Sequence, residues 1–259
     1  MKVDSLHLIH PYSCYTLTAN IAFYSTYFEP IDLKWRSIMT RKTFRENMKA
    51  LEKEIISQGE MVNVALERSV AALRSLDITK AEKVVIDDLL INRKRWNIEE
   101  QCINLLATQQ PVATDLRELI AVLSISTDLE RMGDHAEGIA RIAIMHKDKP
   151  LIKPLVDIPR MAEKASDMLM RSIEAFISRD AKTAKAICEE DDEVDALYDQ
   201  TYRELLSFMI EDPTIITRGT YLLWAAHNLE RIADRVTNIC ERIIFLVTGS
   251  MEEINVSNY

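Results

Sequence analysis

Glycine is scarce in this sequence, with five residues among 259. Together with abundant alanine, leucine, isoleucine and glutamate, this scarcity predicts a mostly helical chain. There is no glycine-rich loop of the kind that cradles phosphates, and neither the GxSxG nor the HExxH motif occurs. None of the five histidines follows a glutamate by three residues, as the ferritin-like di-iron enzymes require. Because no nucleophile lies beside a base, we expect the protein not to be an enzyme.

Long apolar runs and paired cysteines are missing as well. No stretch of about 18 apolar residues occurs, so we expect no membrane span. The amino end has a lone Lys2 followed by a segment broken by polar residues, which makes a poor signal peptide. No two cysteines have the CxxC spacing of a zinc or redox site, and we expect small buried side chains in a reducing cytosol. The cysteines are Cys14, Cys102, Cys188 and Cys240.

Basic residues are outnumbered, and the formal net charge is −9. A nucleic-acid-binding surface needs a basic stripe, so this charge speaks against such partners. It fits a protein that binds cations or the basic surfaces of other proteins.

One acidic pattern occurs twice, as LERMGD at 129–134 and as LERIAD at 229–234, 100 residues later. In each copy a glutamate and an aspartate are four residues apart: Glu130 with Asp134, and Glu230 with Asp234. On a helix these side chains lie on one face, one turn apart. Two carboxylates that close repel each other until a cation lies between them. The duplicated pattern therefore predicts metal ligands.

A simpler interpretation of the same pattern stays open. Acidic residues on a helix face are usually solvated, and Glu130 and Asp134 could be paired with Arg131 or Arg141. The apolar stripe of each motif helix lies on another side, which predicts carboxylates that face out of the core and a site on the bundle surface. The stripes are Leu129, Met132, Ala136, Ile139 and Ala143, and Leu229, Ile232, Val236, Ile239 and Ile243.

The helix-capping residues, the prolines that end helices and the duplicated acidic motif predict an all-α fold. We expect a tandem repeat of two three-helix bundles with six long helices. Residues 1–38 lack helical periodicity, and we interpret them as a weakly ordered extension. The first repeat spans 39–149, the second 150–249, and 250–259 form a tail. The expected helices cover about 43–76, 79–110, 114–146, 158–178, a long helix from the cap Asp180 to before Pro213, and 217–247.

An antiparallel helix hairpin places residues equally far from its turn at the same level. Counting back from Pro111 sets Asn92 and Asp88 opposite the first acidic pair. Counting back from Pro213 sets Asp195 and Asp192 opposite the second, with Asp191 adjacent. Four such oxygens could hold Ca²⁺, Mg²⁺, Mn²⁺, iron or zinc. Glu137 and Asn238 extend the two faces by a turn, and His135 and His227 are weaker candidate donors.

Taken together, these motifs resemble the PhoU family over about residues 40 to 248. The matching elements are Gln110-Pro111, Asp115-Leu116-Arg117, Val194 to Tyr198 and the two acidic motifs. The resemblance implies a pair of three-helix bundles that bind multinuclear iron or zinc, with manganese or magnesium as alternatives. The ligands it implies are Glu130, Asp134, Glu230 and Asp234, with Asp88, Asp191 and Asp195 as contributors. Two departures are Asn92, where an acid would complete the first pair, and Ala233, where the first motif has Gly133.

The same resemblance implies a cytoplasmic regulator of phosphate uptake. Such a protein links the ATPase subunit of the phosphate ABC transporter to a sensor histidine kinase and represses the starvation response when phosphate is plentiful. It would reach the membrane through these partners, and a homodimer is the family's common state. Two other classes stay open from the residues alone. One is an acidic helical scaffold that binds basic partners and holds metal only adventitiously, and a weaker one is a hydrolase with clustered metals.

Overall fold

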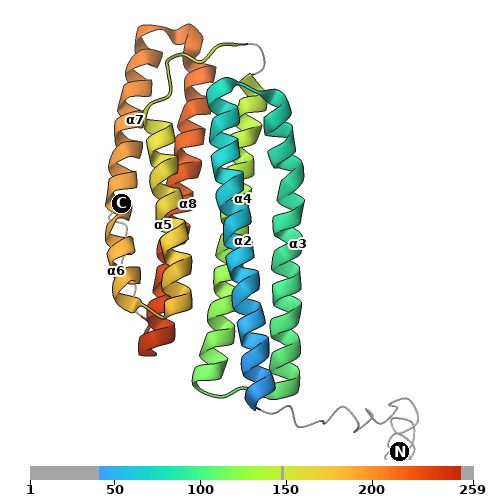
Figure 1. Ribbon diagram of the computed structural model, residues 1–259. Helices are drawn as coiled ribbons and strands as arrows, with labels where there is room; N and C mark the ends of the chain where they lie inside the picture. Colours follow the sequence, from blue (N-terminus) through green and yellow to red (C-terminus); the bar gives the residue numbers. More distant parts are fainter. Residues whose placement is uncertain (1–40, 147–148, 252–259) are drawn as a thin grey trace, which may run out of the picture. The chain divides into compact units, whose positions relative to one another are not determined.

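Helices make up every regular element of the described chain. The computed structural model describes residues 41–146 and 149–251, so the expectations for 1–38, for Cys14 and for most of the tail lie outside the described residues. The all-α prediction is confirmed for these ranges (Figure 1). The elements are α2 (Arg41–Ser75), α3 (Ile78–Gln109), α4 (Thr114–His146), α5 (Asp157–Ser178), α6 (Ala181–Glu189), α7 (Asp191–Glu211), the 3₁₀ turn η2 (Pro213–Ile215) and α8 (Ile216–Thr248).

The long helix predicted between Asp180 and Pro213 is wrong, because the chain breaks into α6 and α7 at Glu190. Asp180 caps α6 as expected, and its carboxylate accepts the backbone N–H groups of Lys182 and Thr183. The break falls within the acidic run at 189–193. These carboxylates repel one another inside a continuous helix but are favourable in the first turn of a new one. Arg171 adds a two-pronged contact with Glu190, at 2.8 Å to each oxygen.

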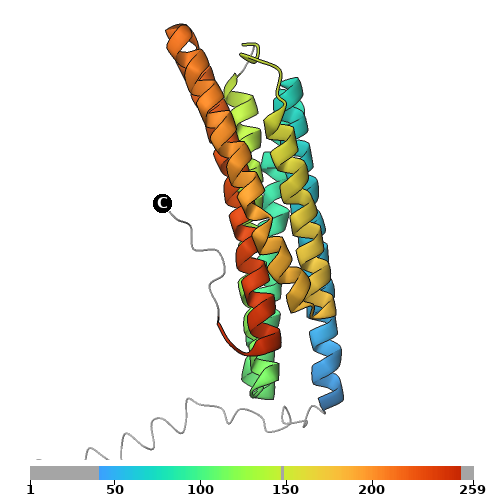
Figure 2. The same cartoon turned by 90° about the vertical axis from the view of Figure 1, so that its left-hand side faces the viewer.

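The chain divides into two units, Met1–Thr43 and Phe44–Tyr259, and the helices described here belong to the second apart from the first three residues of α2. Within it, α4 packs against α8, α3 packs against α4, and α5, α6 and α7 pack against α8. Figures 1 and 2 show these helices running side by side. The two helices that carry the acidic motifs therefore lie next to each other, each with a companion helix on its other side.

The apolar stripes predicted for the motif helices form the core between α4 and α8. All ten of their side chains are fully buried. The stripe recurs every three or four residues, so each turn of α4 and α8 places an apolar side chain against the neighbouring helices. None of the helices in the described ranges is long and apolar enough to cross a membrane. The three cysteines in these ranges are buried and free, as expected.

A buried carboxylate ties the end of α5 to the first repeat. Glu118 on α4 accepts from Arg45 of α2 at 3.2 Å and from Arg179, which ends α5. Arg179 also contacts Glu52 of α2 at 2.6 Å. The shared guanidinium and carboxylate groups satisfy one another, so this charged cluster is compatible with a buried position.

Candidate metal centre

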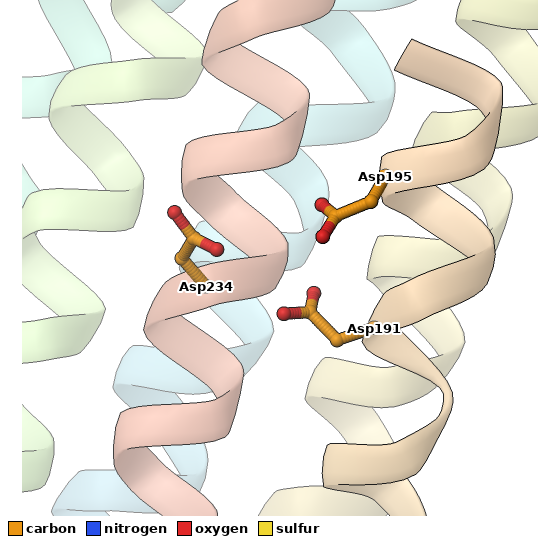
Figure 3. Close-up of side chains that lie close together, drawn as sticks. All are labelled: Asp191, Asp195 and Asp234. Atoms are coloured by element: carbon orange, nitrogen blue, oxygen red, sulfur yellow. The ribbon is translucent and has the colours of Figure 1, made fainter. Parts of the chain in front are cut away.

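Three aspartates from two helices meet in the second repeat. Asp191 and Asp195 lie one turn apart on α7, and Asp234 faces them from α8 (Figure 3). Each offers a carboxylate oxygen, and these oxygens lie within 4.8 Å of one another. We call these residues with Glu230 the second acidic cluster. Among the described residues, this is the group of acidic, histidine or cysteine side chains that comes close enough to share one ion.

Repulsion within this cluster is visible in the pKa of Asp195. Burial and then the charges of Asp234 and Glu230 raise the pKa of Asp195 to about 6. Burial also raises the pKa of Asp234, although Arg231 acts in the opposite direction. In the described chain no lysine or arginine lies within ion-pair distance of Asp195. The carboxylates thus surround a position where a cation would remove their mutual repulsion.

Two neighbouring side chains already contact part of this cluster. Arg231 contacts Asp234 at 2.6 Å, and His227 places Nδ1 2.8 Å from the buried carboxylate of Glu230. Glu230 therefore contributes charge next to the three aspartates while one of its oxygens is engaged by a neighbour on its own helix. The interpretation that the acidic residues are simply paired with basic side chains therefore holds for Asp234 and Glu230. It does not hold for Asp195.

The corresponding group in the first repeat, the first acidic cluster, comprises Asp88 on α3 with Glu130, Asp134 and Glu137 on α4. Asp88 is buried, and Asn92 donates to its Oδ2 at 2.8 Å. Its Oδ1 is buried without a hydrogen-bond partner. Burial, followed by the charges of Asp134, Glu137 and Glu130, raises the pKa of Asp88 to about 6.

Gly133 explains how Asp88 comes so close to α4. A Cβ at this position would lie 3.2 Å from Oδ1 of Asp88 and 3.1 Å from Cδ1 of Ile91. The missing side chain lets α3 and α4 approach each other at the level of the cluster. The second motif has Ala233 instead, so the two clusters differ in geometry as well as in the asparagine at position 92.

Arginines surround the first cluster more closely than the sequence indicated. Glu130 lies 3.8 Å from Arg131, as the simpler interpretation expected, and 3.6 Å from Arg95 of α3. Arg141 contacts Glu137 at 2.6 Å. Arg95 was missed, although its position seven residues after Asp88 places it two turns along the same helix face. These cations leave Asp88 and Asp134 as the less neutralised side of the cluster.

Several weaker expectations can now be placed. Asp191, rather than Asp192, faces α8, because the inward side of α7 includes the buried residues 191, 194, 201 and 205. His135 bonds to Asn228 at 2.9 Å. Glu230 is buried, so the expectation that the motif carboxylates face outward holds for the exposed Asp134 but not for Glu230.

The donor set fits a hard or borderline cation. Carboxylate oxygens suit magnesium, calcium, manganese and iron, and they are found around zinc when water completes its shell. The second cluster supplies three such oxygens, and the buried, unpartnered Oδ1 of Asp88 supplies one in the first. A bound ion would supply positive charge between neighbouring helices. Metal binding at the seven proposed residues stays a prediction.

Asparagine at position 88 is expected to stabilise the metal-free protein at alkaline pH. The pKa of Asp88 in the folded protein, about 6, lies above its ordinary value of 3.8, so ionisation of Asp88 opposes folding as the pH rises above about 4. The isosteric amide removes a penalty of about 3 kcal/mol at pH 8. This advantage shrinks as the pH falls through 6 and disappears below about pH 4.

Urea unfolding of chelated protein between pH 4 and 8 measures this difference. Asp87→Asn is the matched control, because Asp87 lies outside the cluster and pairs with Arg68 of α2 at 3.4 Å. A constant difference between Asp88→Asn and the wild type across this pH range would contradict the assigned pKa.

Comparison with known proteins gives one consistent answer. The PhoU domain matches residues 55–143 and again 158–243, and the repeats predicted at 39–149 and 150–249 enclose these segments. The phosphate-specific transport system accessory protein PhoU homolog of Clostridium acetobutylicum is 36% identical over 218 residues, which cover 84% of this chain and all of that protein. The homolog of the same description from Aquifex aeolicus is 38% identical over 210 residues, covering 81% of this chain and 95% of that protein.

Solved structures agree with the sequence relatives. The crystal structure of PhoU from Pseudomonas aeruginosa has a TM-score of 0.77 and 34% identity, and the match covers 80% of this chain and all of that one. The phosphate transport system regulatory protein PhoU from Streptococcus pneumoniae gives a TM-score of 0.76 and 33% identity, covering 81% of this chain and 99% of that one. The helical arrangement described above is therefore shared with proteins of known structure.

Proposed function

Because the chain belongs to the PhoU family, we propose that it is an accessory protein of phosphate-specific transport. In this proposal it acts in the cytoplasm as a metal-binding adaptor between the ATPase subunit of the phosphate ABC transporter and a sensor histidine kinase. When phosphate is plentiful, it represses both uptake and the starvation response. It reaches the membrane through these partners, works as a homodimer and catalyses no reaction.

The observation that carries the proposal is that the family match includes both repeats, together with their acidic motifs. The curated relatives that match most of this chain are described as accessory proteins of phosphate-specific transport. An adaptor that binds both a transporter and a kinase needs protein-binding surfaces rather than a catalytic site. The long exposed helix faces of both repeats support that kind of role.

The proposed metal would neutralise the acidic clusters and hold neighbouring helices together. Asp191, Asp195 and Asp234, with Glu230 beside them, would hold an ion or cluster in the second repeat. Asp88, Glu130 and Asp134 would do so in the first. Iron or zinc is the proposed metal, with manganese or magnesium as alternatives. By neutralising the carboxylates, the ion would fix the position of α7 against α8 and of α3 against α4.

A second candidate function is a scaffold whose acidic faces bind basic partner surfaces without metal. The contacts of Arg231 with Asp234 and of Arg131 with Glu130 favour it, because they show that cationic side chains can occupy these faces. Binding of the purified transporter ATPase in the presence and absence of chelator distinguishes the two. The adaptor proposal expects binding to fall with chelator, and the scaffold expects no change.

Deleting this gene is expected to switch on the phosphate-starvation genes in cells grown with abundant phosphate. The reason is that repression in the proposal requires the adaptor to connect the transporter and the kinase. Transcript profiling of the deletion strain measures the effect, and the wild-type gene supplied in trans should restore repression. An unchanged transcript profile in high phosphate would remove the regulatory assignment.

A further inference from the structure

Polar side chains join the two motif helices at two places. Arg235 of α8 contacts Asp128 of α4 at 3.3 Å. His135 of α4 places Nδ1 2.9 Å from Oδ1 of Asn228 on α8. The shift of 100 residues that relates the acidic motifs carries Asp128 onto Asn228. It also carries His135 onto Arg235, so the two contacts are equivalent, with the roles of α4 and α8 exchanged.

A second pair of contacts follows the same symmetry. A Cβ at Gly138 would lie 3.2 Å from Oδ1 of Asn228, so the missing side chain leaves room for this amide. The residue 100 positions after Gly138 is Asn238, and its side chain hydrogen-bonds to Asp128. The helices α4 and α8 therefore cross antiparallel about a local two-fold axis. Their contact lies between the two acidic clusters, because α3 packs against α4 and α7 packs against α8 (Figure 1).

On each helix the contact residues flank the acidic motif. Asp128 is two residues before Glu130, and His135 directly follows Asp134. The equivalent residues of α8 hold the same places around the second motif. Because the two contact residues of a helix are seven positions apart, they lie on one face, which meets the other motif helix. Each acidic cluster therefore shares a helix turn with a contact to the other repeat.

Arg235 connects the second cluster to the first. Burial raises the pKa of Asp234, and the positive charge of Arg235 is among the influences that lower it. The same guanidinium pairs with Asp128, so two carboxylates attract it from different helices. A cation bound at the second acidic cluster would neutralise Asp234 and leave Arg235 to Asp128. Because Asp128 lies in the turn of α4 that carries Glu130, this contact then holds a carboxylate of the first cluster in place.

His135 makes the equivalent connection in the other direction. The amide nitrogen of Asn228 donates to the backbone carbonyl of Trp224 at 2.8 Å, so its Oδ1 is the acceptor for Nδ1–H of His135. His135 adjoins Asp134 of the first cluster, and Asn228 lies two residues before Glu230 of the second. Coupling between two sites is reciprocal, so cation binding at either cluster should affect the other equally.

We propose that these two contacts couple the acidic clusters, so that a cation bound at one cluster raises the affinity of the other for a cation. The positioning residues are Asp128, His135, Asn228 and Arg235. The inference rests on the metal binding of the proposed function, and it adds that both repeats fill over one range of cation concentration. Coupling between sites commonly changes affinity by about 5- to 150-fold.

Calorimetric titration of the chelator-treated full chain with Mn²⁺ tests the coupling. Asp88→Asn combined with Asp134→Asn leaves the second cluster intact, and Asp191→Asn combined with Asp234→Asn leaves the first. The overall binding constant of the wild type should exceed the product of the constants of these two variants by about 5-fold or more. Independent clusters would give a ratio within about 2-fold of one, and this result would overturn the coupling.

Repeating the three titrations without the contacts identifies their role. Asp128→Ala, Arg235→Ala and Asn228→Ala together remove both contacts without changing the net charge, and they should abolish most of the excess. The matched control is Glu54→Ala combined with Lys94→Ala, which removes an ion pair of 2.6 Å between α2 and α3. The control should keep the excess. An excess that persists without the contacts, or that is lost equally in the control, would overturn the assigned residues.

A conservative exchange separates positioning from simple stability. Asp128→Asn combined with Arg235→His places at the first contact the same pair of residues that the chain uses at the second. This variant should keep most of the excess, because the local symmetry gives the new pair the geometry of His135 and Asn228. An excess lost here as fully as in the alanine variant would contradict the proposed role. If Mn²⁺ binds to none of these proteins, the metal-binding proposal fails together with the coupling, whereas independent binding at both clusters overturns the coupling alone.

Discussion

Replacing Asp191 and Asp234 together with asparagine is expected to weaken cation binding at the second acidic cluster by about 100-fold or more. The two substitutions remove two of the three carboxylates that converge between α7 and α8. Changes beyond the ligands of a metal site already lower affinity by about 10- to 100-fold, and losing ligands themselves should have a larger effect. Asparagine keeps the size of the side chain, so the change is one of charge.

Calorimetric titration of chelator-treated protein with Mn²⁺ or Zn²⁺ measures this effect. The matched control is Asp192→Asn combined with Asp199→Asn, which removes the same net charge from exposed positions of α7 outside the cluster. The control should bind within a few-fold of the wild type. If it loses as much affinity as the Asp191/Asp234 variant, the effect comes from the general acidity of the surface and the assigned site is wrong.

Alanine at position 229 is expected to lower the free energy of unfolding by about 3 kcal/mol. Leu229 is fully buried beside Glu230, in the stripe where α8 packs on its neighbours. Truncating a buried leucine removes its transfer free energy and leaves a cavity in a core that relaxes only in part. The substitution therefore weakens the packing of α8, the helix that carries the second motif.

Leu206→Ala is the matched control, because Leu206 is 40% exposed on α7 and undergoes the same chemical change. It should lower the unfolding free energy by less than about 1 kcal/mol. Urea unfolding in the presence of chelator separates packing from metal binding. Equal losses for the two variants would contradict the placement of the 229–243 stripe in the core.

The sequence was informative about the helices because their buried faces repeat with helical spacing. The stripes beginning at Leu129 and Leu229 are buried as predicted, and α4 begins and ends at the predicted residues. The break at Glu190 was not predictable in the same way. No proline or glycine marks it, and it depends on repulsion within the acidic run and on the tertiary contact with Arg171.

The candidate site was predicted in composition more accurately than in orientation. The count from Pro213 placed Asp195 near the second motif, but it favoured Asp192 where Asp191 faces Asp234. A hairpin count gives the level of a residue and not the rotation of its helix, which here follows the buried side of α7. The contacts of Arg95 and Asn92 likewise depend on how α3 is rotated against α4.

The central claim is that the two repeats hold a cation between neighbouring helices, most favourably among Asp191, Asp195 and Asp234. Anomalous diffraction from crystals grown with iron or zinc measures this directly. We expect an anomalous peak coordinated by these three carboxylates. A peak bound elsewhere, or metal-free carboxylates paired only with arginine in crystals grown with excess metal, would contradict the account.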